Sequence, residues 1–88
     1  MERYRVLIKP SAKKELLAIA TKKNRQRVVA KIQALAQEPR PPGCEKLAGR
    51  NRYRIRQGNY RIVYAIEDQS LIVLVIKVGH RRDVYRSS

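Results

Sequence analysis

The chain has 88 residues, which is the length of one small domain, and its 21 Lys and Arg against 7 Asp and Glu give a net charge of +14 at pH 7. A charge of this size implies a polyanionic partner, and nucleic acid fits best. No apolar run approaches the roughly 18–20 residues that a membrane-spanning helix needs, and no signal-peptide segment follows Met1, so we expect a cytoplasmic protein without a membrane partner. The single cysteine, Cys44, and the single histidine exclude an internal disulfide and a Cys/His zinc cluster, and no cofactor or metal is expected.

The first half of the chain predicts one short strand followed by two amphipathic helices. Residues 4–8 (YRVLI) are rich in strand-forming side chains, Pro10 ends the run, and Ser11 is placed to cap the helix that follows. Helices are predicted over residues 11–20 and 24–38, because apolar side chains recur at helical spacing and basic residues fill the other face. The two predicted stripes are Ala12, Leu16 and Ile19 in the first helix, and Val28, Ile32 and Leu35 in the second.

Residues 38–51 (EPRPPGCEKLAGRN) predict an irregular loop, because three prolines and a glycine stop the second helix. Three strands are predicted after it, and their short connections make them an antiparallel meander. They cover residues 52–57, 60–67 and 71–78. The order β-α-α-β-β-β predicts a single α+β domain over residues 1–88, with a helical hairpin packed on one face of a small, mainly antiparallel, twisted sheet.

Strand alternation predicts that the sheet face away from the helices is cationic. Arg52, Arg54 and Arg56 project from the same face of their strand. In the next strand, Arg61 is the first of the side chains that project from one face. Between Glu45 and Glu67 there are six Lys or Arg residues and no acid. Four apolar residues are expected on the same open face, namely Val63, Ala65, Val73 and Val75. The alternative is an ordinary solvated face of a basic protein.

The segments RYRIRQGNYRIVYAI (52–66) and VIKVGHRRDVYR (75–86), within this order of elements, resemble the RelE/ParE toxin superfamily and RelE most closely. The resemblance covers essentially the whole chain. It implies a RelE-like fold and a ribosome-dependent endoribonuclease that cuts mRNA in the decoding site and is held inactive by an antitoxin. By position, the functional side chains of RelE toxins correspond here to Arg54, Arg56, Arg61, Arg81 and Tyr85.

The chemistry of RNA cleavage favours the same side chains. Without a metal, the neighbouring 2′-hydroxyl is the nucleophile, so the protein must move protons and neutralise the crowded phosphate. The rigid guanidinium forks of Arg61 and Arg81 suit the phosphate, and the ring of Tyr85 suits stacking on a base or, alternatively, docking on the sheet.

The general base is the open question in this sequence. The basic positions of the first meander strand are often Lys in the family, whereas here they are Arg54 and Arg56, and arginine is a poor base. His80 is therefore a candidate for proton transfer. If strand alternation persists through Val78, however, His80 points away from Arg61 unless the chain turns at Gly79.

Two classes of function remain open at this point: a ribosome-dependent endoribonuclease, and a ParE-like inhibitor of DNA gyrase without nuclease activity. A plain RNA-binding adaptor would have no reason for the Gly-His-Arg-Arg ending. The expected partners are the 70S ribosome, mRNA and a RelB-like antitoxin whose acidic segment wraps the toxin in a hetero-oligomer. Contacts to RNA phosphates are assigned to Lys46, Arg50, Arg52 and Arg82.

Overall fold

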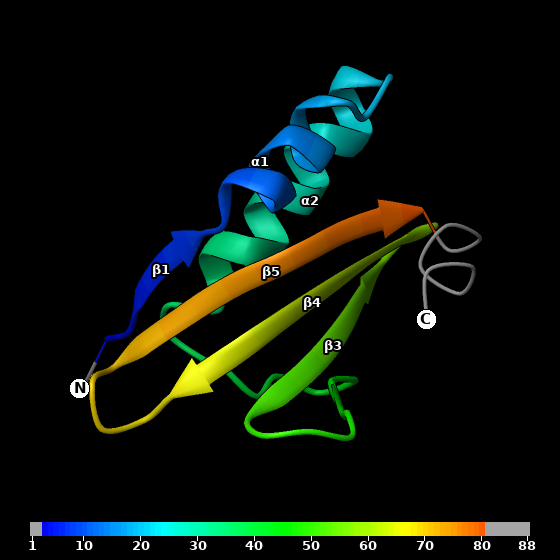
Figure 1. Ribbon diagram of the computed structural model, residues 1–88. Helices are drawn as coiled ribbons and strands as arrows, with labels where there is room; N and C mark the ends of the chain where they lie inside the picture. Colours follow the sequence, from blue (N-terminus) through cyan, green and yellow to red (C-terminus); the bar gives the residue numbers. More distant parts are fainter. Residues whose placement is uncertain (1–2, 81–88) are drawn as a thin grey trace.

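The computed structural model describes residues 3–80, and over this range the chain forms two helices packed on a mixed, five-stranded sheet (Figure 1). The sheet order is β1-β5-β4-β3-β2, with β1 parallel to β5 and the other neighbours antiparallel. The predicted α+β fold is therefore confirmed. The elements are β1 (Arg5–Ile8), α1 (Pro10–Leu17), α2 (Lys22–Ala34), β2 (Glu45–Lys46), β3 (Arg52–Gln57), β4 (Tyr60–Glu67) and β5 (Ile72–His80).

Both helices are shorter than the sequence predicted. Pro10 occupies the first turn of α1, where its missing N–H is no loss, and Lys9 rather than Ser11 is the N-cap residue, so the predicted Ser11 cap is wrong. At the C-terminal end of α2, the Leu35 N–H donates to the Ile32 carbonyl at 3.1 Å. This tighter i→i+3 bond closes the helix before the proline-rich loop begins.

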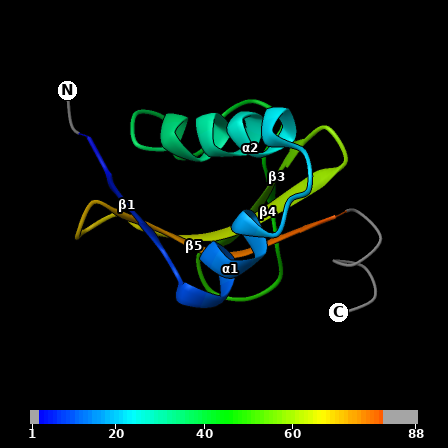
Figure 2. The ribbon, with the colours of Figure 1, turned by 90° about the horizontal axis from the view of Figure 1, so that it is seen from above.

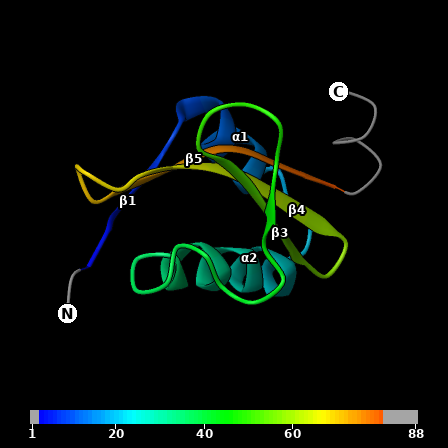
Figure 3. The same ribbon diagram turned by 90° about the horizontal axis from the view of Figure 1, so that it is seen from below.

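The helices cover one face of the sheet and build the core there. From above, α1 lies over β5 and α2 lies beside β3 and β4 (Figure 2); from below, β5 lies in front of α1 (Figure 3). Both predicted helical stripes are buried, as are the alternate residues of β3, β4 and β5 that face them. The core comprises Ala12, Leu16, Ile19, Val28, Ile32, Leu35, Tyr53, Ile55, Ile62, Tyr64, Ile66, Val73, Val75 and Val78.

A β-bulge in β5 sets which of its side chains face the helices. Val63 pairs with Lys77, whereas the next residue, Tyr64, pairs with Val75, which leaves Ile76 as the extra residue. An extra residue reverses the alternation of faces along a strand.

The bulge overturns part of the predicted open face. Val73 and Val75 are fully buried against the helices, so their placement on the open face was wrong. Val63 and Ala65 are half-buried on β4, where they share a face with Arg61, and Leu74 pairs with Ala65. The apolar part of the open face is therefore smaller than predicted.

A cluster of polar side chains attaches the proline-rich loop to the turn between β4 and β5. The Arg40 guanidinium donates to both carboxylate oxygens of Asp68, at 3.2 and 2.9 Å, and Tyr4 donates to the same carboxylate at 2.7 Å. Arg40 also donates to the Tyr53 hydroxyl at 3.2 Å. The loop is thereby fixed against the end of the sheet at which β3 begins and β4 turns into β5.

Candidate nucleic-acid interface

Four arginines lie together on the open face of the sheet, as the sequence predicted. In the antiparallel pairing of β3 with β4, Arg56 lies opposite Arg61, Arg54 opposite Val63 and Arg52 opposite Ala65. Directly opposed residues project to the same side of a sheet. We refer to Arg52, Arg54, Arg56 and Arg61 as the arginine face.

Arg61 is the most enclosed residue of the arginine face, with only 2% of its surface exposed. Its neighbours across the sheet are Arg56 on β3 and Gly79 on β5. A like charge directly opposite is unfavourable, while Gly79 contributes no side chain that would crowd the guanidinium. The fold thus encloses a cation at the centre of the sheet, directly opposite a second one.

The structure adds a carboxylate to this face that the sequence did not reveal. Glu45 on β2 lies opposite Arg54, and its Oε2 accepts a hydrogen bond from Arg54 Nη2 at 2.8 Å. The Arg54 side chain is 18% exposed and that of Glu45 is 55% exposed, so the acid remains open to solvent. Arg54 Nε is buried without a hydrogen-bond partner among the described residues. A strand of two residues after a proline-rich loop has no periodicity that would have predicted this pairing.

Beside the arginine face, the loop between β2 and β3 forms a hollow of about 310 Å³. We call it the loop pocket; it is lined by Leu47, Ala48, Gly49, Arg50, Arg52 and Val63. Two of the predicted phosphate contacts, Arg50 and Arg52, therefore lie together. Lys46 does not join them, because it pairs with Tyr53, which faces the helices, and its Nζ lies 5.4 Å from the centre of the Tyr53 ring.

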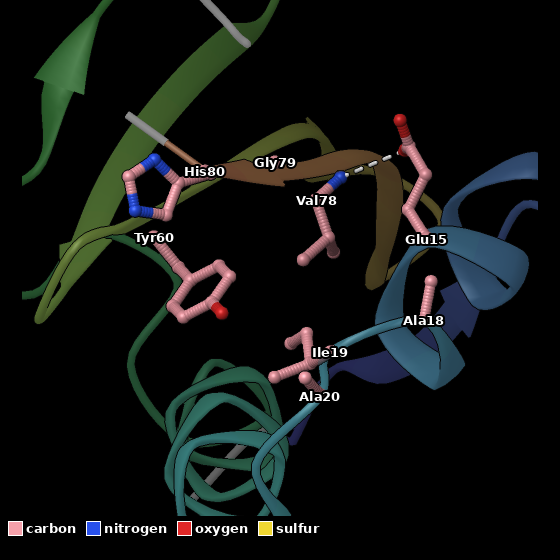
Figure 4. Close-up of a pocket in the computed structure, with 8 residues that line it drawn as sticks. All are labelled: Glu15, Ala18, Ile19, Ala20, Tyr60, Val78, Gly79 and His80. Carbon is pink, nitrogen blue, oxygen red and sulfur yellow. Dashed lines mark hydrogen bonds between the residues drawn. The ribbon is translucent and has the colours of Figure 1, made fainter. Parts of the chain in front are cut away.

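His80 is on the opposite face of the sheet from Arg61. Strand β5 continues straight through Gly79, which pairs with Arg61, and His80 pairs with Tyr60 and meets its ring edge-on at 5.5 Å. Figure 4 shows both rings beside a pocket of about 330 Å³ that α1 and the following loop close. In the same pocket, Val78 N–H donates to Glu15 at 3.1 Å.

Three predicted site residues, Arg81, Arg82 and Tyr85, lie outside the described residues.

Within residues 3–80, no cluster of three or more His, Cys, Asp or Glu side chains could hold a metal ion. No helix in this range is both long and apolar enough to cross a membrane.

Comparison with known proteins places this chain and its fold in a class of proteins. A family model described as the ParE toxin of the type II toxin–antitoxin system, parDE, matches residues 6–85. The class is therefore that of toxins from type II toxin–antitoxin systems. The chain belongs to the ParE toxin family, within the RelE/ParE superfamily.

The relatives include a toxin named RelG and solved complexes of RelE-type toxins. Toxin RelG of Mycobacterium tuberculosis is 40% identical over 45 residues, which is 51% of this chain and 49% of RelG. The match thus spans about half the length of that relative. Among solved structures, the RelBE2 toxin–antitoxin complex of M. tuberculosis aligns at a TM-score of 0.80 and 26% identity, covering 92% of this chain and 94% of that one. The archaeal RelE–RelB complex of Pyrococcus horikoshii aligns at 0.80 and 29% identity, covering 92% and 97%.

Proposed function

We propose that this toxin is a ribosome-dependent endoribonuclease that cleaves mRNA in the decoding site and so inhibits translation. The observation that carries the proposal is the arginine face, with Arg61 enclosed at its centre. Arginine forks bind two phosphate oxygens at once, and four of them gathered on one face can neutralise a phosphate whose charge increases during reaction.

The reaction is an attack by the 2′-hydroxyl oxygen on the adjacent phosphorus. The new O–P bond gives a 2′,3′-cyclic phosphate, the bond to the 5′-oxygen breaks, and one proton leaves the 2′-hydroxyl while another reaches the departing oxygen. Arg61 and, from outside the described residues, Arg81 are the proposed phosphate contacts. Tyr85 is the proposed stacking side chain, while Arg54 and Arg56 assist in neutralising charge.

For the proton transfer from the 2′-hydroxyl we propose Glu45 in place of His80. Glu45 is held beside the arginine face by Arg54 and is open to solvent. His80 lies beside Tyr60 on the other face of the sheet and lines a different pocket (Figure 4). A general base must come within hydrogen-bond reach of the proton that it removes, and this requirement favours the residue on the arginine face.

We further propose that an antitoxin and the ribosome are the macromolecular partners. The solved relatives include RelB–RelE complexes, and the net charge of +14 suits an acidic, RelB-like wrapping segment in a cytoplasmic hetero-oligomer. Such a segment would cover the arginine face together with the apolar side chains of Val63, Ala65 and Leu74. With few groups to align the 2′-hydroxyl, the toxin relies on the ribosome to position the mRNA.

Single-turnover cleavage of mRNA on purified ribosomes tests the proposal. We expect Arg61→Ala to lower the rate by roughly 10²–10³-fold, the usual effect of losing one preorganised donor, with ribosome affinity little changed. Arg61→Lys keeps the charge, and so the fold, but loses the fork, and it should be slow as well. Thermal unfolding of both variants controls for misfolding. Cleavage at the parent rate by both would refute the assignment of this face.

The alternative function is inhibition of DNA gyrase, which the ParE description of the matching family model favours. A supercoiling assay with purified gyrase decides between the two functions. Inhibition of supercoiling without any ribosome-dependent cleavage would replace the nuclease with the gyrase inhibitor. Cleavage without inhibition is the expected result.

A further inference from the structure

The loop pocket has features that binding to RNA phosphates alone does not require. Three of its lining residues, Leu47, Ala48 and Val63, are apolar, and the other walls include two exposed arginines, Arg50 and Arg52. Its volume of about 310 Å³ is at the lower end of the range for ligand sites, roughly 300–1,000 Å³. A flat apolar ring with hydrogen-bond acceptors on its edge fits this lining.

The loop that forms the pocket is fixed to the sheet at two points. Leu47 N–H donates to the Arg52 carbonyl at 2.9 Å, and Ile66 N–H donates to the Asn51 carbonyl at 3.0 Å. Between these bonds, Gly49 and Asn51 have φ angles of +105° and +56°, which produce the tight return of the chain. A pocket whose walls are already in place binds its ligand with less loss of conformational entropy.

The pocket adjoins the arginine face. Val63 belongs to its lining, lies opposite Arg54, and is two residues along β4 from Arg61. Two residues of a strand span about 7 Å, which is on the scale of one nucleotide of extended RNA. A strand whose phosphate meets Arg61 therefore has a neighbouring base within reach of the pocket.

We propose that the loop pocket is a nucleobase subsite that reads the base next to the cleaved phosphodiester and favours guanine. This inference rests on the proposed function, because it takes RNA to be the ligand of the arginine face. Arginine donates two parallel hydrogen bonds to O6 and N7 of guanine, and this edge is accessible in single-stranded RNA. Arg52, which lies on both the arginine face and the pocket wall, is the residue that makes this contact, and Leu47, Ala48 and Val63 pack against the ring.

Binding of short RNA without ribosomes tests the subsite separately from cleavage. The probes are fluorescent 2′-O-methyl pentanucleotides, which lack the attacking hydroxyl, with four uridines and a central guanine, adenine or 7-deazaguanine. Anisotropy titrations of the full chain at low salt give the three affinities. We expect guanine to bind at least roughly fivefold more tightly than adenine, the lower limit for a bidentate base contact, and 7-deazaguanine, which lacks the N7 acceptor, to lose most of that difference.

Two variants and their matched controls localise the effect. Arg52→Gln removes the fork and Ala48→Leu fills the pocket without changing the charge; each should abolish the preference for guanine. Arg27→Gln and Ala30→Leu make the same changes at exposed positions of α2. Arg27→Gln should weaken binding of all three probes equally, and Ala30→Leu should change nothing.

The outcomes separate failure of the subsite from failure of the proposed function. A parent chain without base preference, or a preference that persists in both pocket variants, overturns the subsite even if mRNA is cleaved on ribosomes. A guanine preference lost in both variants supports the subsite even if no cleavage is found. A chain that binds none of the probes overturns the subsite and removes the main support for the proposed function.

Discussion

Arg61 faces Arg56 across one strand pair and Gly79 across the other, and only 2% of its surface is exposed. Arg54, one pair along, is already hydrogen-bonded to Glu45. The two arginines are therefore not equivalent. Arg61 is enclosed at the middle of the face, whereas Arg54 is half-buried and holds the Glu45 carboxylate beside it.

Substitution of Glu45 and His80 separates the two candidates for proton transfer. We expect Glu45→Gln to slow single-turnover cleavage on the ribosome by roughly 10²–10⁴-fold, the usual contribution of a general base. His80→Gln should cleave at close to the parent rate. The reverse pattern would assign proton transfer to His80 and leave Glu45 with the structural role of holding Arg54.

At the scale of elements, the contact between the proline-rich loop and the β4–β5 turn depends on the ionised form of Asp68. The hydrogen bond from Arg40, followed by that from Tyr4, lowers the pKa of the Asp68 carboxyl below its ordinary value of 3.8. A carboxyl group whose pKa is lower in the folded than in the unfolded protein stabilises the fold at pH values above its unfolded-state pKa. This stabilisation is lost as the pH falls through the folded-state pKa.

We therefore expect Asp68→Asn to lower the thermal unfolding midpoint at neutral pH, with the difference from the parent shrinking below about pH 4. Midpoints measured by circular dichroism between pH 2 and 7 give the comparison. Asp68 is exposed, so the effect should be small. A difference that is constant across this range would show that the carboxylate charge is not what holds the loop.

The same loop is also held from inside the sheet. The buried Tyr64 hydroxyl donates to the Pro39 carbonyl at 2.7 Å, and burial, more than any other cause, raises the pKa of Tyr64 above its usual range. Because the unfolded chain ionises this tyrosine more easily, stability should fall as the pH rises above about 10.

Tyr64→Phe tests this dependence. Loss of the hydrogen bond should cost about 1 kcal/mol at neutral pH, while the decline of stability at alkaline pH should become shallower than in the parent. Urea unfolding at pH 7 and at several alkaline values measures both effects. An unchanged alkaline slope would assign the decline to other groups.

For the molecule as a whole, the charge distribution predicts how binding responds to salt. A single-stranded RNA that contacts all four residues of the arginine face should show a slope of about −3 in a plot of log K against log salt, from about −0.7 per neutralised phosphate. Arg56→Gln should reduce the magnitude of that slope by about 0.7. Lys13→Gln, an equal charge change on the exposed side of α1, should leave it unchanged. Equal effects of the two variants would mean that the RNA does not select the arginine face.

The amino-acid sequence by itself determined the fold class, the two buried helical stripes and the gathering of Arg52, Arg54, Arg56 and Arg61 on one face. These features follow from local periodicity, since residues three or four apart share a helix face and alternate residues share a strand face. The sequence also showed directly that the charged residues between 46 and 66 are all basic, and it showed the resemblance to RelE/ParE toxins.

Tertiary structure alone decided how the strands align with one another. The bulge at Ile76 turned Val73 and Val75 toward the helices, and it left Val78 and His80 on the same side as those valines. The pairing of β2 brought Glu45 to Arg54, and the return of the chain at Gly49 formed the loop pocket. Each of these depends on the register between neighbouring strands and on the loop that joins them, not on the pattern within one strand. Register is set by the packing of whole faces, and a shift of one residue changes every contact beyond it without changing the local pattern.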